Sequence, residues 1–396
     1  MNTNRAVFLL SLSAFASAAS LRATDPLLPL LAAEFAVTTG GAAVIVTAFA
    51  IPYGLLQVVY GPVGDRYGKY AVVCAMTLAS ALTTLACAFA PTLDALSLAR
   101  FAAGATVGAV VPLSMAWIGD SVAYAERQTV MARFLIGQVL GIGFGQAGAG
   151  MLGEAFGWRA IFAVVGVLYV IVGVLLLIEL RTNPATHRGG GVPVSIRAGV
   201  VRMAGLFRKS WARAVVGSVF VEAALMYGPL AFVAAHLQHR FMIGPAAAGS
   251  IVAAFALGGL MYALAARPVI ARLGERGLAL GGGIALGIGY FLLAFASAAW
   301  VAVPCMLSVG MGYFMLHSTL QVHATQMAPE ARGASLSLFA LCLFGGQSAG
   351  VWIAGQVVDA AGAAPVFLLA GIGLPLLGWS FRRRLKLHAR EARPVS

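Results

Sequence analysis

Residues 61–70 read GPVGDRYGKY and lie between two long apolar stretches of the chain. Three of these ten residues are charged and three are glycines, although only 10% of the 396 residues in the chain carry a charge. The six residues are Gly61, Gly64, Asp65, Arg66, Gly68 and Lys69. A charged, glycine-rich segment between apolar ones is typical of a short loop that joins two membrane-spanning helices.

Composition places the whole chain in a membrane. Hydrophobic residues make up 61% of the sequence and charged residues 10%, whereas soluble domains carry about 25% charged residues. The 48 glycines agree, because small residues let membrane helices approach closely. The N-terminus imitates a cleavable signal peptide, but its apolar run continues through DPLLPLLAAEF, so we interpret it as the first spanning helix.

Apolar windows of about twenty residues, the length that crosses a bilayer, predict twelve spanning helices. They lie near residues 7–33, 41–63, 70–90, 93–119, 129–152, 159–180, 214–237, 246–268, 277–297, 299–324, 333–357 and 364–381. The predicted fold is an all-α membrane protein with an N-terminal six-helix bundle (1–180), a basic cytoplasmic linker (181–213), and a C-terminal six-helix bundle with a basic tail (214–396). The linker is expected to form an amphipathic helix on the inner leaflet, with a solvated loop as the alternative.

Basic residues predict the orientation. With the N-terminus inside, 22 of the 26 lysines and arginines fall in cytoplasmic segments, and only Arg159 and Arg240 fall in outer loops. The positive-inside rule therefore predicts a multi-pass protein of a bacterial-type inner (plasma) membrane with both termini in the cytoplasm. The same asymmetry explains the net charge of +13 without a nucleic-acid partner.

The two sets of six helices carry matching segments in the same order, at spacings between 201 and 206 residues. The pairs are PVGDRYG at 62–68 with PVIARLG at 268–274, Pro26-Leu27 with Pro229-Leu230, and Gly145-Gln146 with Gly346-Gln347. These matches indicate an internal duplication. Two related six-helix halves around a shared site are the architecture of alternating-access carriers.

On these features the chain resembles the major facilitator superfamily over essentially its whole length. GPVGDRYGKY resembles that family's signature between spans two and three, which is a glycine, three residues, Asp-Arg, one residue, a glycine and basic residues. Tyr70 stands where a second basic residue is often found. The resemblance is to the twelve-span, proton-coupled drug and metabolite efflux branch, and it implies secondary transport by alternating access.

We predict that the 61–70 segment is a conformational latch. Gly61 and Gly64 would let the second span approach a neighbouring helix, which the resemblance implies is the eleventh. Asp65 would face the positive N-terminal end of that helix, and Arg66 would pair with Asp120 at the inner end of the fourth span. Simple anchoring of loop charge at the membrane surface is the alternative.

Ionisable residues inside spans are costly and are therefore functional candidates. Asp25 is the predicted proton carrier, with Arg22 on the same helical face and Arg100 at a similar depth in the fourth span. Arg100 belongs to RFAAG, which resembles a fourth-span motif of the family, and the resemblance implies a part in proton transfer. A static Asp25–Arg22 pair is the alternative, and Glu222 in the seventh span is a second candidate acid.

The fifth span, GQVLGIGFGQAGAGMLGE, is similar to the glycine-rich antiporter signature of exporters, but Gln146 stands where that signature usually has proline. Close helix packing would also explain Gly141, Gly145 and Gly148. We predict proton-coupled efflux of a small organic molecule by antiport. Proton-coupled uptake of a small metabolite by symport is the alternative.

Polar and aromatic side chains on the spans that line the cavity of such a fold suit a moderately sized, partly apolar substrate. They are Tyr53, Gln57, Gln138, Gln146, Tyr227, Tyr262, Tyr313, His317 and Gln347. Each could instead hold two helices together.

Nothing in the sequence predicts catalysis, a cofactor or a metal site. No nucleophile elbow, phosphate-binding loop or acid–histidine cluster within one segment is present. The four cysteines lie in apolar runs without a CxxC pair. We expect a monomeric transporter and not an enzyme, with a small molecule, protons and the lipid bilayer as its partners.

Overall fold

The structure is a computed structural model and describes residues 3–187, 196–328 and 331–391. These residues are almost entirely helical and contain no strand. The first half comprises α1 (Thr3–Arg22), η1 (Asp25–Leu27), α2 (Leu28–Glu34), α3 (Thr39–Ala42), α4 (Val44–Leu55), α5 (Gln57–Tyr67), α6 (Lys69–Ala88), α7 (Leu93–Val107), α8 (Val110–Ser121), α9 (Tyr124–Phe156) and α10 (Arg159–Thr182). It is followed by η2 (Pro184–His187), α11 (Ile196–Leu206), α12 (Ser210–Phe241), α13 (Pro245–Ala294), η3 (Ala299–Val301), α14 (Ala302–Gln326), α15 (Arg332–Ala361) and α16 (Ala364–Glu391).

These helices account for the twelve predicted spans. Within the described ranges, ten helical segments are long and apolar enough to cross a membrane, and a pair bent by 50°, Thr39–Leu55 with Gln57–Tyr67, forms an eleventh. Helix α13 has 50 residues, about 75 Å at 1.5 Å per residue, which is more than twice the ~30 Å hydrocarbon core. It is broken at Gly274 (φ 60°, ψ 177°), so it counts as two spans.

Prolines interrupt the spans at defined places. Pro52 lies one turn before the bend between α4 and α5. It explains the bend, because proline removes a backbone hydrogen-bond donor and clashes with the preceding turn. Pro26 lies in η1, where the first span breaks. Pro229, by contrast, lies within α12, which runs as a single helix of 32 residues.

The backbone repeats itself along the chain. The described residues with positive φ are Ala36, Gly68, Gly157, Met242, Gly274 and Gly362. They form three pairs separated by 205 or 206 residues, so these three turns of the first half recur in the second. The fold is therefore two pseudo-symmetric six-helix bundles.

Close helix contacts repeat at the same spacing. A Cβ added at Gly141 on α9 would overlap the carbonyl oxygen of Phe15 on α1, and one added at Gly346 on α15 would overlap that of Phe220 on α12. Both glycines thus allow backbone-to-backbone packing, in which only a hydrogen atom fits. These two seams join α1 to α9 and α12 to α15.

The register of the repeat differs by one helical turn from the sequence match in the fifth and eleventh spans. The sequence paired Gly145 with Gly346, whereas Gly145 lies against Ala19 and its structural counterpart Gly350 lies against Ala224. The reason is that the spans contain several glycines about one turn apart, so identical letters align in more than one register.

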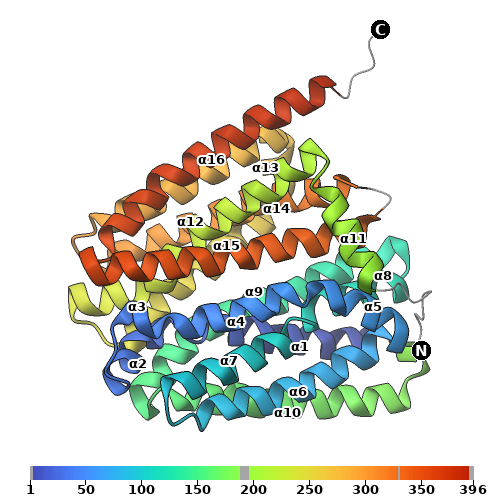
Figure 1. The fold of residues 1–396 in the computed structure, drawn as a ribbon, viewed down its shortest axis with the longest axis horizontal. Coiled ribbons are helices and arrows are strands. Elements are labelled where there is room, and N and C mark those ends of the chain that lie inside the picture. The colour runs from blue at the N-terminus through green and yellow to red at the C-terminus, as the bar shows by residue number, and fades with distance from the viewer. Residues whose placement is uncertain (1–2, 188–195, 329–330, 392–396) are drawn as a thin grey trace. The chain divides into compact units, whose positions relative to one another are not determined.

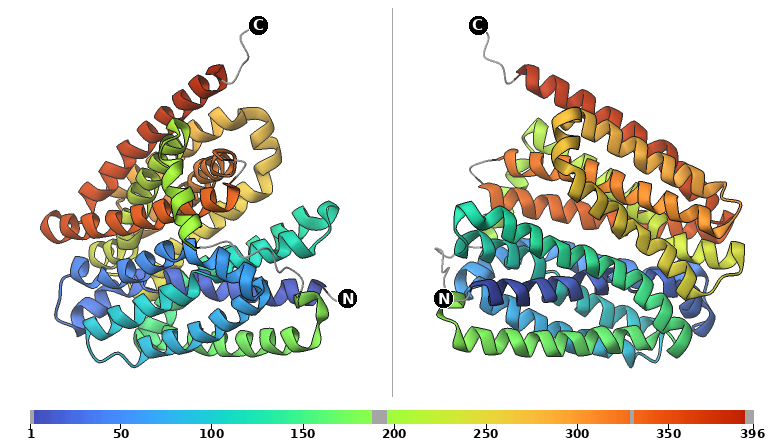
Figure 2. Two further views of the ribbon diagram at one scale, coloured as in Figure 1. Left: turned by 45° about the vertical axis from the view of Figure 1, so that its right-hand side comes forward. Right: turned by 180° about the vertical axis from the view of Figure 1, so that it is seen from behind.

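Contacts divide the chain into two compact units, Met1–Val200 with Gly244–Ser250, and Val201–Ile243 with Ile251–Ser396. In each unit the long helices run side by side (Figures 1 and 2). In the first, α1 packs along α9 and α6 along α10; in the second, α12 packs along α15. The unit boundary falls within α11, in the segment where the sequence predicts an amphipathic linker helix.

Candidate functional site

Asp25 lies where the first span is broken. Helix α1 ends at Arg22, η1 begins at Asp25 with Pro26 behind it, and α2 restarts at Leu28. Pro26 has no backbone N–H with which to continue the hydrogen bonds of α1, and its ring clashes with the preceding turn, so it explains the break. The Asp25 side chain is fully buried. Broken spans of this kind are found at the binding sites of secondary transporters.

Two buried side chains contact the same oxygen of Asp25. Nη1 of Arg22 lies 3.4 Å from Oδ2, and Nε2 of Gln146 on α9 donates a hydrogen bond to Oδ2 at 2.8 Å. The second oxygen, Oδ1, is buried and has no hydrogen-bond partner among the described residues. The amide contact has the length of a well-formed hydrogen bond to a carboxylate, about 2.7–2.9 Å, whereas the Arg22 contact is longer. Gln146, predicted only as a cavity residue, is therefore part of the acid site.

Arg100 is fully buried nearby and is held by backbone and aromatic groups. Its Nη1 donates to the carbonyl of Ser20 at 3.1 Å and its Nε to that of Ile45 at 3.5 Å. Its guanidinium carbon lies 4.0 Å from the centroid of the Phe49 ring. Among the described residues, no ion pair joins Arg100 to Asp25, so the part of Arg100 in proton transfer stays a prediction.

The second unit contains a separate buried acid. Glu222 on α12 is fully buried, and its Oε2 lies 2.9 Å from Nδ1 of His317 on α14. The His317 ring stacks on Tyr313 with 4.8 Å between centroids. Tyr227 donates its hydroxyl to the Tyr313 hydroxyl at 2.8 Å. Glu222, predicted as an acid, and three residues predicted for the cavity thus form one connected polar chain.

Gln57 has a packing role. Its amide donates to the carbonyls of Tyr53, at 3.1 Å, and of Gly108, at 2.9 Å. The first contact supports the bend between α4 and α5, and the second ties that bend to the fourth span. Tyr53 is buried beside it.

The remaining predicted cavity residues lie on the expected helices. The Tyr262 hydroxyl is 3.3 Å from Oγ of Ser318. Gln347 is buried and Gln138 is half-buried. None of these contacts joins them to Asp25 or Glu222 within the described residues, so their part in a substrate cavity stays a prediction.

The charged segment after the second span is held by Lys69. Its Nζ lies 2.6 Å from Oδ2 of Asp120 and 3.1 Å from Oδ1 of Asp65. The predicted Arg66–Asp120 pair is wrong, because Arg66 is exposed and its guanidinium lies over Tyr67, 5.2 Å from the ring centroid. The chain turns at Gly68, so Lys69, at the start of α6, faces α8.

The glycines of this segment have different roles. Gly68 has φ +91°, a conformation that favours glycine, and ends α5. A Cβ at Gly64 would lie 2.7 Å from Cδ2 of Leu113, so α5 approaches α8 closely there. Gly61 has no such neighbour in its unit. The predicted contact of Asp65 with the eleventh span would join the two units and stays a prediction.

One buried acid was missed by the sequence reasoning. Glu179, near the end of α10, is buried, accepts a hydrogen bond from Nδ2 of Asn183 at 2.7 Å, and lies 3.1 Å from Nε of Arg5. The signal was an acid within the apolar run LLLIELRT. Arg5 and Asn183 compensate the charge of Glu179, and the Arg5–Glu179 ion pair joins the start of α1 to the end of α10.

Comparison with known proteins identifies the family. The model of the Major Facilitator Superfamily matches residues 10–351. Tetracycline resistance protein, class G, of Vibrio anguillarum is 32% identical over 277 residues, which cover 66% of this chain and 67% of that protein. The uncharacterized MFS-type transporter YwfA of Bacillus subtilis is 25% identical over 395 residues, which cover 98% and 94% of the two chains.

The fold agrees with solved transporters. A POT family transporter in complex with 5-aminolevulinic acid superposes with a TM-score of 0.77 at 13% identity, over 98% of this chain and 96% of the other. A peptide transporter POT in complex with sulfate superposes with a TM-score of 0.77 at 15% identity, over 97% and 94%. The chain belongs to the Major Facilitator Superfamily and is a multi-pass membrane transporter, not an enzyme.

Proposed function

We propose that this transporter exports a small organic molecule across a bacterial inner membrane in exchange for protons. The observation that carries the proposal is the Asp25 carboxyl, which is buried at a helix break and has one oxygen without a hydrogen-bond partner in the described part of the chain. Relatives named as tetracycline resistance proteins favour the outward direction. A membrane transporter that protects a cell from a compound must move that compound out.

Asp25 is suited to carry a proton because its charged form depends on two movable partners. A carboxylate in a dry site is costly unless it is paired. Arg22 and Gln146 supply that pairing through a single oxygen. When Asp25 takes up a proton, both partners lose most of their attraction to it, and the broken backbone beside it gives the outer part of the first span freedom to move.

Glu222 is the second proton site in this proposal. It touches His317, which can itself gain a proton, so the pair can hold or release one without leaving an isolated charge in the core. The His317 ring stacks on Tyr313, whose hydroxyl accepts a hydrogen bond from the Tyr227 hydroxyl. Asp25 and Glu222 lie on corresponding helices of the two halves, the first span and α12.

The charged segment completes the proposal as a latch on the cytoplasmic side. Lys69 joins Asp65 to Asp120, so a change in the position of the second span must alter a paired cluster. The excess of basic residues on one side supports cytoplasmic termini. We propose that the chain works as a monomer whose halves are joined by the 181–213 linker.

The test is a proton-flux assay in vesicles that contain the purified protein and a pH-sensitive dye. Candidate compounds, with tetracycline among them, are added against an imposed pH gradient. We expect substrate-dependent proton movement in the direction opposite to that of the compound. We expect Asp25→Asn to reduce the rate of this proton movement at least about tenfold, which corresponds to about 1.4 kcal/mol. Asp94→Asn, the same change at an exposed carboxyl, is the matched control.

The outcome separates the roles. If Asp25→Asn still exchanges protons at the wild-type rate while Glu222→Gln does not, the proton is carried by the second unit and the assignment of Asp25 is wrong. If compound and protons move in the same direction, the transporter is a symporter and the export proposal is overturned.

A further inference from the structure

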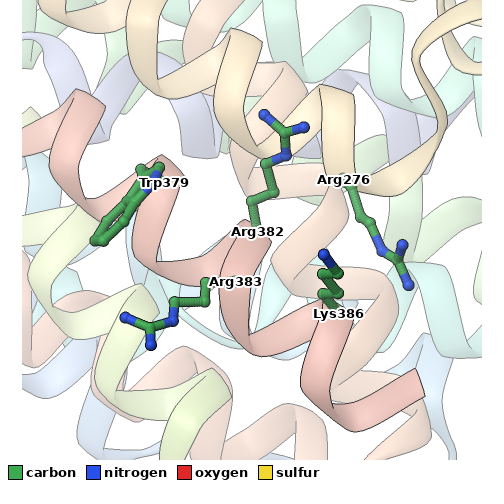
Figure 3. A pocket seen from close by; sticks show the side chains of 5 residues that line it. All are labelled: Arg276, Trp379, Arg382, Arg383 and Lys386. Carbon is green, nitrogen blue, oxygen red and sulfur yellow. The ribbon is translucent and has the colours of Figure 1, made fainter. Parts of the chain in front are cut away.

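A cationic cavity of about 320 Å³ lies between the second part of α13 and the C-terminal part of α16. Four basic side chains and a tryptophan line it: Arg276, Trp379, Arg382, Arg383 and Lys386. Figure 3 shows that Arg276 comes from α13 and that the other four side chains come from α16. The cavity lies at the end of α16 that the sequence predicts to be cytoplasmic.

The positive charge of this cavity is not compensated by any carboxylate among the described side chains. No ion pair joins any of its four basic side chains to a carboxylate among the described side chains. The neighbouring acid, Glu275, is directed instead to His323, with 3.2 Å between Oε2 and Nε2. Arg383 lies with its guanidinium carbon 5.9 Å from the Trp379 ring centroid. Four like charges around one hollow repel one another unless an anion lies between them.

A separate apolar groove lies along the same two helices. It has a volume of about 240 Å³ and is lined by Ile284, Ile288, Phe291, Leu292, Gly371 and Pro375, with Gly287 at its base. Trp379 of the cavity follows Pro375 of the groove by one turn of α16. From Arg276 to Leu292 the helix extends about 24 Å, which exceeds the ~15 Å depth of one leaflet's hydrocarbon.

The groove exists because the two helices touch through glycine. A Cβ added at Gly287 would overlap the ring of Pro375, and one added at Gly283 would lie 2.6 Å from the carbonyl oxygen of Leu374. Since the backbones meet, the larger side chains stand on either side of the contact and leave a channel between them. Its lining faces lipid, as the half-exposed Ile288 and Leu292 show.

The general excess of basic residues at cytoplasmic helix ends does not explain this cluster. At the same 205- or 206-residue spacing, its five positions correspond in the first half to Tyr70, Val174, Leu177, Ile178 and Arg181. Four of these five are uncharged, although the corresponding helices α6 and α10 form the same kind of pair. The fold therefore does not require charge at these positions.

We propose that this cavity binds the phosphate headgroup of an anionic phospholipid, whose acyl chain lies in the apolar groove. Guanidinium groups bind phosphate oxygens through paired donors, and tryptophan is favoured at the depth of the headgroups. Basic pockets between helices on the cytoplasmic side recognise such headgroups. Four positive charges favour a lipid with two phosphates, so cardiolipin should bind more tightly than phosphatidylglycerol.

The experiment is a lipid titration of the purified full chain, followed by native mass spectrometry. Cardiolipin and phosphatidylglycerol are the anionic probes, phosphatidylcholine is the zwitterionic control, and inorganic phosphate tests the headgroup chemistry without a chain. The variant Arg382→Gln/Lys386→Gln removes two charges from the cavity. Arg384→Gln/Arg208→Gln removes two exposed charges outside it and is the matched control.

We expect the cavity variant to bind cardiolipin about thirtyfold more weakly, since each basic group near a lipid surface contributes about a fivefold change, and the control variant to change binding by less than about twofold. Ile288→Trp, which narrows the groove without touching the charges, should weaken long-chain lipids and leave short-chain ones unaffected. Ile288→Trp also tests the proposal if Arg382→Gln/Lys386→Gln does not fold.

Three results would overturn the proposal. Equal weakening by the two charge variants would mean that only net charge matters. Phosphatidylcholine binding as tightly as cardiolipin would remove the role of the basic residues. Inorganic phosphate competing fully at concentrations equal to those of the lipid would make the cavity a free-anion site, with no role for the groove.

Discussion

The seam between α12 and α15 allows a sharp test of the packing, because two adjacent glycines on α15 differ only in what lies beside them. A Cβ at Gly346 would overlap the carbonyl oxygen of Phe220 and lie 2.9 Å from its carbonyl carbon, whereas the nearest atom to a Cβ at Gly345 is a ring carbon of Phe220 at 3.7 Å. Gly346→Ala must therefore displace backbone, and Gly345→Ala only makes an ordinary contact.

The magnitude follows from what the two variants share. Both replace glycine by alanine within one helix, so both gain the same helix propensity of about 0.8–1.0 kcal/mol, and this gain cancels in the comparison. Overpacking against atoms that cannot turn aside costs about 1–3 kcal/mol. A difference of about 2 kcal/mol corresponds to a midpoint about 4–8 °C lower for a unit of this size.

The assay is thermal unfolding of both variants in the same detergent, followed by size-exclusion chromatography to count the folded fraction. We expect the thermal midpoint of Gly346→Ala to lie about 4–8 °C below that of Gly345→Ala. The repeat adds a second pair of measurements, since Gly141→Ala should suffer the same loss against Phe15 in the first half. If Gly346→Ala melts with Gly345→Ala or above it, the two helices do not meet through their backbones and the described seam is wrong.

Three further predictions follow from single contacts. Lys69→Met leaves Asp65 and Asp120 without their shared cation and should slow transport severalfold in vesicles, whereas Arg66→Met, at an exposed side chain, should change the rate by less than about twofold. Arg100→Lys keeps the charge but loses the planar group that contacts two carbonyls and an aromatic ring, so the thermal midpoint should fall by the equivalent of about 1–2 kcal/mol. Gly68→Ala forces φ +91° on a residue with a Cβ, and should cost about 1–3 kcal/mol of unfolding free energy, measured in the same melting assay.

The spans could be predicted from the sequence because lipid imposes one simple rule on them. Apolar runs of about twenty residues are needed to cross a bilayer, and the runs are bounded by charge and glycine. The ninth span is predicted separately from the eighth. It lies in the same helix α13 but beyond the break at Gly274, in agreement with that prediction.

The partners of the buried charges could not be predicted from the sequence. Gln146 contacts Asp25 across 121 residues and His317 contacts Glu222 across 95 residues, and neither pairing leaves a local pattern. In the 61–70 segment, even a partner of nearby charged residues could not be predicted. Arg66 and Lys69 are three residues apart, and only the turn at Gly68 decides which of them reaches Asp120.

The Asp25–Pro26 break has a mechanical consequence that the second half does not share. The first span is interrupted at Asp25, whereas α12 carries Glu222 within one continuous helix that also contains Pro229. The two halves therefore differ at corresponding helices: the first span is hinged beside Asp25, and α12 is continuous past Glu222. In the proposed mechanism, protonation of Asp25 moves only the short segment η1–α2 beyond the break, whereas a displacement at Glu222 is transmitted along the whole of α12.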